Sequence, residues 1–356
     1  MIWMVSAAVA ATVLLEFGLE VRALILQTGD ASPRTRLLEA YDPFVSERLH
    51  PFYLFGFPLP PDERLSLGNE VCSLDRHGFR EPGLDQKGTR KLAFLLGGSV
   101  TFGLFARSND TTITAHLNRL QSEYFFVNAG TPGFNSTQEL IRLTVEAADF
   151  SPSLIVALNG WNDATLAAES WWVDDQLPAA TPGPYPTLDE WARQSRLSRD
   201  FGVGRLFPQI SDRTNRLEIW LRGREPGSPA TEQALKDSAL RYRRNLERMH
   251  QVSTAIGARF IGVFQPLISL HQQRDPGVEA SDDLVSFHRH AVSMAGHGGE
   301  FHDLGNVFDA HFASVRASED LDAAAVFFDE GHLHEQGNEI VAGHLADLIR
   351  SSAPSH

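Results

Sequence analysis

The sequence contains very little cysteine: Cys72 is the single thiol in a chain of 356 residues. A disulfide within the chain is therefore impossible, and so is a zinc or iron–sulfur site built on several cysteine ligands. One thiol does not by itself place the chain in the cytosol, because many exported bacterial-type proteins also lack disulfides.

Positive charge is also scarce and scattered. The formal net charge is −14, and lysine and arginine form no long cluster. The chain therefore lacks the basic surface by which proteins bind nucleic acid or anionic membranes, and we expect no nucleic-acid partner. Hydrophobic residues make up 42% of the chain and charged residues 21%, which is the composition of a globular protein with a sizeable core.

Long hydrophobic runs are rare as well. The N-terminal run, MIWMVSAAVAATVLL at residues 1–15, is shorter than the roughly 20 residues that span a bilayer as a helix. Extended to Leu26 the segment would be long enough, with Glu16 and Glu20 on one face near an interface. A cleaved signal peptide is one alternative, although its basic n-region is missing, and a buried core helix is another.

We predict that residues 1–27 form a signal anchor or membrane helix. The rest of the chain would then lie outside the cytoplasm, in the periplasm or at the cell surface. It would be secreted if the N-terminal segment is cleaved.

Short apolar runs alternate with helical patterns from about residue 89 onward. Each run is bounded by turn residues, as in strands that are buried on both faces of a parallel sheet. The runs lie at 92–97, 124–129, 153–158 and 258–265, with a weaker fifth at 301–304. Ser136 and Glu139 have the spacing of a capping box, and residues 231–256 repeat apolar side chains every three or four positions. The alternation predicts a doubly wound α/β sheet.

Two segments do not follow this alternation. Residues 28–88 are rich in proline, glycine and aromatic residues without a clear period, which indicates an irregular extension packed on a main domain at 89–353. Residues 164–230 carry four of the six tryptophans and lie between a strand and a long helix. An insertion of that length in a compact domain is typical of a lid.

The stretch GGSVTFG at residues 97–103 follows the first apolar run of the sheet. It has no lysine for a phosphate-binding P-loop, and it fits neither the dinucleotide fingerprint nor the G-x-S-x-G elbow. What remains is a serine, Ser99, just beyond the carboxyl end of a strand, where open α/β sheets bind their ligands. Such a hydroxyl becomes a nucleophile only when a neighbouring base accepts its proton.

The stretch DEGHLHEQGN near the C-terminus offers that base. Asp329 and His332 are three residues apart, so the carboxylate can hold the imidazole and fix its tautomer. Taken alone, Asp329 is better explained as a solvated helix cap. His332 and His334 also form an H-x-H pattern, but no third ligand is evident, and we predict neither a metal nor a cofactor.

Two further strand ends carry groups that could stabilise negative charge on a substrate oxygen. Gly133, in NAGTPGFNS, could offer a backbone N–H, and Asn162, in NGWND, could offer a side-chain N–H. Glycine is also common in strand–helix turns, and asparagine there often caps a helix. The three strand ends and the late D-x-x-H pattern are stronger together than any one of them.

These four blocks, in this order, resemble the SGNH (GDSL-like) hydrolase superfamily over residues 89–350. The triplet GGS at residues 97–99 takes the place of GDS, the triplet for which the family is named, so Gly98 stands where the family pattern has aspartate. The resemblance implies a three-layer α/β/α flavodoxin-like fold with about five parallel strands, and acyl chemistry with Ser99, Asp329 and His332 as catalytic residues. It also implies an oxyanion hole made by the Ser99 and Gly133 N–H groups and the Asn162 side chain. The N-terminal apolar segment is similar to that of membrane-anchored bacterial members.

We therefore expect a serine esterase that works through an acyl-enzyme on an ester of a cell-envelope glycan or lipid. The first alternative is a glycan O-acyltransferase, and the second is a non-catalytic, membrane-tethered binding protein. Three aromatic residues, Trp161, Trp171 and Trp172, are expected to contact the substrate, although they could instead pack the core of a lid. The sequence predicts no oligomeric state.

Overall fold

The computed structural model describes residues 48–50, 54–56, 71–168, 231–271, 281–294, 300–318 and 326–351. The predicted N-terminal helix at 1–27 and nearly all of the predicted insertion at 164–230 lie outside these residues. Within the described ranges, no helix is both long enough and apolar enough to cross a bilayer.

The centre of the described domain is a parallel sheet of five strands. They are β3 (Lys91–Gly97), β4 (Tyr124–Gly130), β5 (Leu154–Asn159), β6 (Arg259–Phe264) and β7 (Glu300–Asp303). The spatial order is β4-β3-β5-β6-β7. The second strand of the sheet, β4, lies on one side of the first strand, β3, and the later strands follow in order on its other side. This is the flavodoxin-like strand order of a doubly wound sheet. The five parallel strands predicted from the sequence are thus confirmed, including the weak fifth. A separate antiparallel pair, β1 (Arg48–His50) and β2 (Leu54–Gly56), precedes the sheet.

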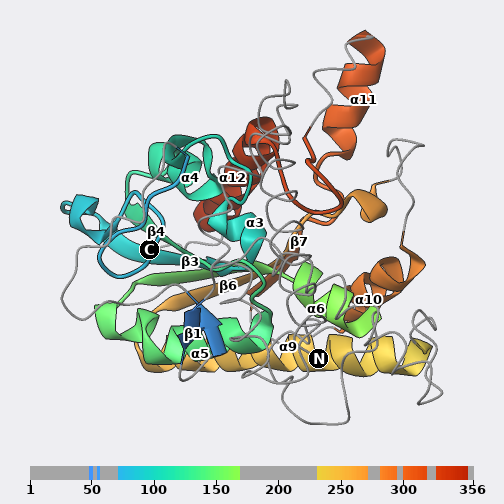
Figure 1. Ribbon diagram of the computed structural model, residues 1–356, viewed down its shortest axis with the longest axis horizontal. Coiled ribbons are helices and arrows are strands. Elements are labelled where there is room, and N and C mark those ends of the chain that lie inside the picture. The colour runs from blue at the N-terminus through green and yellow to red at the C-terminus, as the bar shows by residue number, and fades with distance from the viewer. Residues whose placement is uncertain are drawn as a thin grey trace, which may run out of the picture. The chain divides into compact units, whose positions relative to one another are not determined.

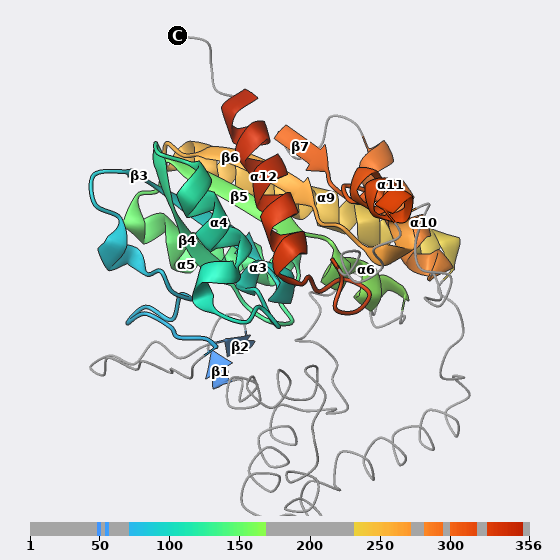
Figure 2. The same ribbon diagram turned by 90° about the horizontal axis from the view of Figure 1, so that it is seen from above.

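Helices cover both faces of this sheet. Figure 1 shows α4 and α12 on one side and α5 and α9 on the other, and Figure 2 shows α3, α4 and α12 lying in front of the strands. The α-helices are α3 (Ser99–Phe102), α4 (Ile113–Leu120), α5 (Ser136–Val145), α6 (Trp161–Ala168), α9 (Glu232–Ala255), α10 (Asp282–Ser293), α11 (Asp309–Ser318) and α12 (Glu335–Ser351). Four short 3-10 turns are η2 (Leu84–Gln86), η3 (Asn109–Thr111), η4 (Ala147–Phe150) and η6 (Ile268–Leu270).

Successive residues of each central strand enter two different cores. In β3, Phe94 packs with the side of the sheet that α5 and α9 cover, whereas Leu95 packs with the side that α4 and α12 cover. Both side chains are fully buried. Because neither face of the strand meets water, its sequence is a continuous apolar run rather than an alternating one.

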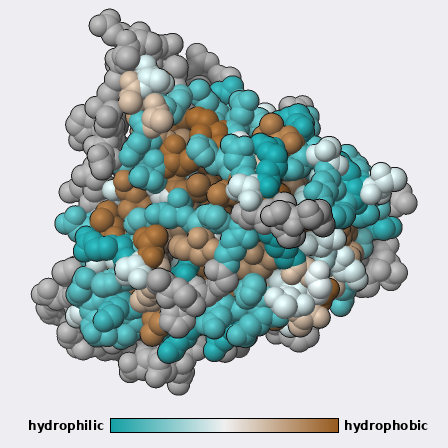
Figure 3. Space-filling model, turned by 180° about the vertical axis from the view of Figure 1, so that it is seen from behind, coloured by the Kyte–Doolittle hydropathy of each residue, from teal (hydrophilic) through white to brown (hydrophobic). Residues whose placement is uncertain are grey.

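The outer surface of the described residues is mostly hydrophilic. On the face in Figure 3, hydrophobic residues show in patches among hydrophilic ones. Among the described residues, Leu120 is the one large hydrophobic side chain that lies open to solvent, at 47% exposure. The two cores therefore take up most of the apolar surface of this part of the chain.

The start of α5 differs from the prediction by one residue. Asn135, and not Ser136, is the N-cap, and its partner in the capping box is Gln138 rather than Glu139. The backbone N–H of Asn135 donates to Gln138 Oε1 over 3.2 Å. Ser136 is already the first helical residue, one position beyond the cap, and its hydroxyl donates to Asp163 Oδ1, 2.6 Å away. The helix therefore begins one residue earlier than the capping pattern indicated.

The helix α3 lies directly against the end of β4. A Cβ built on Gly130 would overlap the backbone nitrogen of Phe102 and lie 2.8 Å from its Cα. Since backbone atoms cannot rotate out of the way, only glycine allows this approach. The carboxyl ends of β3 and β4 are held together with the first residues that follow them.

We expect Gly130→Ala to lower the free energy of unfolding by about 1–3 kcal/mol, the usual cost of inserting a methyl group into a packed site. Gly343→Ala is the matched control, because a Cβ at that position in α12 meets nothing within 4 Å. The control should raise stability by about 0.5–1 kcal/mol, as alanine favours a helix over glycine. Urea unfolding followed by circular dichroism measures both, and equal effects of the two changes would contradict the close approach.

Candidate active site

Ser99 is the first residue of α3, immediately beyond β3. Its side chain is nearly buried, with 7% of the residue exposed. A Cβ built on the preceding Gly98 would lie 2.6 Å from Asn162 Nδ2 and 3.1 Å from the carbonyl oxygen of Phe134. The segments that follow β3, β4 and β5 therefore converge beside Ser99.

Ser99 meets the predicted base directly. The distance from Ser99 Oγ to His332 Nε2 is 2.8 Å, and that from His332 Nδ1 to Asp329 Oδ2 is 2.7 Å. A carboxylate can only accept hydrogen bonds, so Nδ1 donates to Asp329. Nε2 is then the acceptor for the serine hydroxyl. The sequence predicted that these three side chains meet, and the structure brings them together in this order.

The loop that carries His332 is fixed by its own carboxylate. Asp329 Oδ1 accepts the backbone N–H groups of His332 and Gly331, over 2.8 and 3.1 Å. Burial by itself would raise the pKa of Asp329, but the bond and charge of His332 and the two backbone N–H groups together hold that pKa below its ordinary value. Asp329 thus stays ionised and keeps the imidazole in one tautomer.

Two aromatic rings pack edge-on against the imidazole of His332. The ring centroids of Trp161 and Phe105 lie 4.8 and 5.0 Å from that of His332. Phe105 also stacks on Phe328, with 4.1 Å between centroids, and has a left-handed backbone with a φ of 69°. Such a φ is unfavourable for a residue with a side chain and persists only where packing holds it.

The other predicted aromatic contacts have different outcomes. Trp161 was expected to contact substrate; its ring lies against His332 and it remains partly exposed. Trp171 and Trp172 lie outside the described residues. Phe105 was not predicted, because no sequence signal distinguishes a phenylalanine with positive φ from an ordinary core residue.

The predicted oxyanion residues lie in adjoining segments. Gly133 has a φ of 81° in a turn in which the N–H of Phe134 donates to the carbonyl of Thr131 over 3.1 Å. With Pro132 before the glycine, this is the pattern of a type II turn. Asn162 Nδ2 donates to the carbonyl of Phe134 over 2.7 Å. An amide nitrogen carries two hydrogens, so this bond fixes the amide and leaves the second hydrogen for another acceptor.

A buried arginine supports the far end of α3. Arg80 is fully buried, and its Nη1 donates to the carbonyls of Phe102 and Gly103 over 3.1 and 2.7 Å. A cation is favourable at the C-terminal end of a helix, where carbonyl groups lack helical partners. Arg80 belongs to the segment predicted as an irregular extension, and nothing in that segment indicates that an arginine there would be buried.

His334 lies in an aromatic and largely buried setting. Its ring packs against Phe328, 5.4 Å between centroids, and burial lowers its pKa. Within the described part of the chain, no group of three histidine, cysteine or acidic side chains is arranged to hold a metal ion.

Behind the site lies a second carboxylate that the sequence analysis did not single out. Asp163 follows Asn162 in α6 and is 2% exposed. Burial raises its pKa to about 6, although the bonds from Ser136 act in the opposite direction. A signal was present, since Asp163 is the last residue of GWND, but its partner on α5 is not visible in the sequence.

Comparisons with known proteins give distant structural similarities only. No family model matches the chain, and no curated protein matches its sequence. The fold is similar to that of the acetyl xylan esterase AlAXEase, with 12% identity, a TM-score of 0.43, and 72% of this chain and 99% of that one covered. It is also similar to the acetylxylan esterase Axe2 from Geobacillus stearothermophilus, with 14% identity, a TM-score of 0.41 and coverage of 75% and 97%.

A third similar structure is the lipase/acylhydrolase from Enterococcus faecalis, with 16% identity, a TM-score of 0.38 and coverage of 75% and 99%. Identities and TM-scores this low say nothing about the substrate of this chain. The chemistry of the site therefore has to be argued from the residues of this chain alone.

The raised pKa of Asp163 predicts a pH dependence of stability. Between its ordinary value near 4 and about 6, the folded chain holds a proton that the unfolded chain has lost. The free energy of unfolding therefore falls as the pH rises through this window. Asp163→Asn has no proton to lose, so wild type should lose stability relative to the variant from pH 4 to pH 6 and no further above it.

Urea unfolding of both proteins across this pH range makes the measurement. Both proteins should also carry Glu139→Gln, because burial and the charge of Asp163 raise the pKa of this neighbouring buried carboxyl, and its titration would otherwise change with the variant. A stability difference that does not change with pH would contradict the assignment.

Proposed function

We propose that the chain is a serine ester hydrolase that works through an acyl-enzyme. The observation that carries this proposal is the hydrogen-bonded chain from Ser99 Oγ to His332 Nε2 and from His332 Nδ1 to Asp329. A nucleophile, a base and an orienting carboxylate within bonding distance define serine acyl chemistry by geometry and not by sequence position.

In the first half of the reaction, Ser99 Oγ attacks the carbonyl carbon of the ester, and its proton moves to His332 Nε2. The carbonyl oxygen becomes an oxyanion that accepts hydrogen bonds from the N–H groups of Ser99 and Gly133 and from Asn162. Collapse of this intermediate breaks the bond to the alcohol oxygen. His332 gives its proton to that oxygen, and the alcohol leaves.

In the second half, water replaces the alcohol. His332 takes a proton from the water as it attacks the acyl carbon bound to Ser99, and later returns the proton to Ser99 Oγ. The carboxylic acid leaves and the free enzyme is restored. Asp329 stabilises the imidazolium that forms in both halves, because its carboxylate is already ionised and bonded to Nδ1.

We also propose that residues 1–27 hold the domain at the outer face of a membrane and that the substrate is an ester of a cell-envelope glycan or lipid. The apolar run at residues 1–15 supports the anchor. An anchored hydrolase acts on esters within reach of that surface, which favours envelope components over freely diffusing metabolites.

Ser99→Ala should abolish hydrolysis of p-nitrophenyl acetate and labelling by a fluorophosphonate, because both need the serine oxygen as nucleophile. Ser253→Ala is the matched control: Ser253 is fully buried in α9, and its hydroxyl has no hydrogen-bond partner among the residues that the structure describes. The control should keep both properties. If Ser99→Ala folds and still turns over the ester, Ser99 is not the nucleophile and the proposal is wrong.

Asn162→Ala should lower kcat by about 10²–10³ with little change in KM, since an oxyanion donor acts mainly in the transition state. Steady-state kinetics on p-nitrophenyl acetate separate the two constants. A rise in KM at unchanged kcat would instead assign Asn162 to binding of the ground state.

A further inference from the structure

Asp163 is a buried carboxylate that the proposed reaction does not use. Both of its oxygens accept hydrogen bonds from one residue of another helix: Oδ1 from the Ser136 hydroxyl, over 2.6 Å, and Oδ2 from the Ser136 backbone N–H, over 3.0 Å. A carboxylate with two such bonds to a single residue fixes both the distance and the orientation of its partner. The start of α6 is thereby held to the start of α5, and we call these two bonds the Asp163–Ser136 joint.

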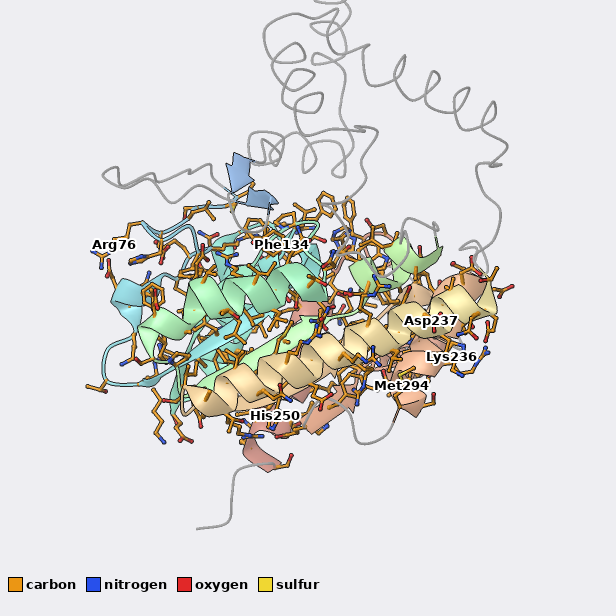
Figure 4. The ribbon with its side chains drawn as sticks, turned by 90° about the horizontal axis from the view of Figure 1, so that it is seen from below. Arg76, Phe134, Lys236, Asp237, His250 and Met294 are labelled. Carbon is orange, nitrogen blue, oxygen red and sulfur yellow. The ribbon has the colours of Figure 1, made fainter. Side chains whose placement is uncertain are left out.

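The Ser136 side of this joint has support from a third helix. Asn245, in α9, donates through Nδ2 to the Ser136 hydroxyl over 3.0 Å and to the Thr137 hydroxyl over 2.9 Å. Figure 4 shows α5, α6 and α9 together on one side of the sheet, and it labels Phe134, two residues before the start of α5. Asn245 is 2% exposed and Ser136 is fully buried, so water does not compete for these bonds.

The residue before Asp163 makes a second link to the same segment. Asn162 donates to the carbonyl of Phe134, two residues before Ser136. Neighbouring residues of a helix point about 100° apart around its axis. The two links therefore fix the rotation of α6 as well as its position, and they do so against the segment that contains Gly133.

The Asp163–Ser136 joint also costs desolvation free energy, which an apolar contact at the same position would avoid. Burial opposes ionisation of Asp163, and replacing a buried charge by an apolar residue is often neutral or stabilising. Stability alone therefore does not explain a carboxylate at this position, and its two directional bonds suit it to placing the neighbouring residues.

We propose that Asp163 is a positioning residue for the oxyanion hole: through Ser136 it holds Asn162 in register with the Gly133 turn. The inference rests on the proposed role of Asn162 in the reaction. Because Asp163 acts through Asn162, no substitution of Asp163 that leaves the fold intact costs more in kcat than the roughly 10²–10³ expected for Asn162→Ala.

A double-mutant cycle tests the coupling. Asp163→Asn keeps the shape of the side chain but leaves one oxygen acceptor instead of two, and it should lower kcat on p-nitrophenyl acetate about tenfold or more at unchanged KM. In an Asn162→Ala background the same change should have almost no further effect on kcat, because the donor that it positions is gone. Ser136→Ala removes the hydroxyl from the other side of the joint and should behave in the same way.

Glu139→Gln is the matched control. Glu139 is also a buried carboxyl in α5, and its side chain accepts a hydrogen bond from Asn159 rather than from the start of α6. The control makes the same chemical change in the same layer and should leave kcat unchanged. Equal losses of kcat from Asp163→Asn in the wild-type and Asn162→Ala backgrounds overturn the inference, as does an unchanged kcat in a folded Asp163→Asn protein.

A crystal structure of Asp163→Asn gives a readout that does not depend on turnover. The distance from Asn162 Nδ2 to the carbonyl of Phe134, 2.7 Å in wild type, should lengthen beyond hydrogen-bonding range. An unchanged distance overturns the inference. If wild type hydrolyses no ester and Ser99 takes no fluorophosphonate, the proposed function is wrong, whereas the measured distance still decides whether Asp163 positions Asn162.

Discussion

The hydrogen bond between Ser99 and His332 joins two residues that are 233 positions apart, and the contacts around α3 and around the His332 loop keep it in place. One partner is fixed by the end of β3. The other lies in a loop whose ends are tied by backbone bonds, from Phe328 N to the His332 carbonyl over 2.8 Å and from Ile268 N to the Glu330 carbonyl over 2.9 Å. A bond of this length survives only if both supports are rigid, because a shift of about 1 Å removes it.

Rigidity at this edge of the sheet comes from close approach and from buried polar contacts. Gly130 lets the backbone of α3 touch the end of β4, and Thr101 donates its hydroxyl to the carbonyl of Leu158 over 3.0 Å. Arg80 holds the carbonyls at the other end of α3. The four-residue helix that carries Ser99 is thus fixed from three directions. Its own hydrogen bonds are too few to do this, since a single helical turn is unstable in isolation.

The sequence predicts what depends on local patterns and misses what depends on distant partners. The strands could be found because β3 and its neighbours are buried on both faces, which requires unbroken apolar runs. Asp329 and His332 could be paired because they lie only three positions apart. The cap of α5 was misplaced by one residue because Asn135 with Gln138 and Ser136 with Glu139 have the same capping-box spacing. The bond between Ser136 and Asp163 was missed because its partners lie 27 positions apart, and Arg80 was missed because its acceptors lie 22 and 23 positions away. No local pattern records such partners.

Two aspartates near the site carry opposite pKa shifts, and the difference follows from their surroundings. Asp329 is about one-third exposed and faces an imidazole, so its pKa is lowered and its charge is available to an imidazolium. Asp163 is buried against uncharged donors, so its pKa is raised. One carboxylate is thus suited to stabilise a charge that appears during the reaction, and the other to hold neutral groups in place. Exchanging their environments would spoil both roles, because an aspartate with a raised pKa in the place of Asp329 would be protonated over a wider pH range, and a neutral carboxyl cannot stabilise an imidazolium.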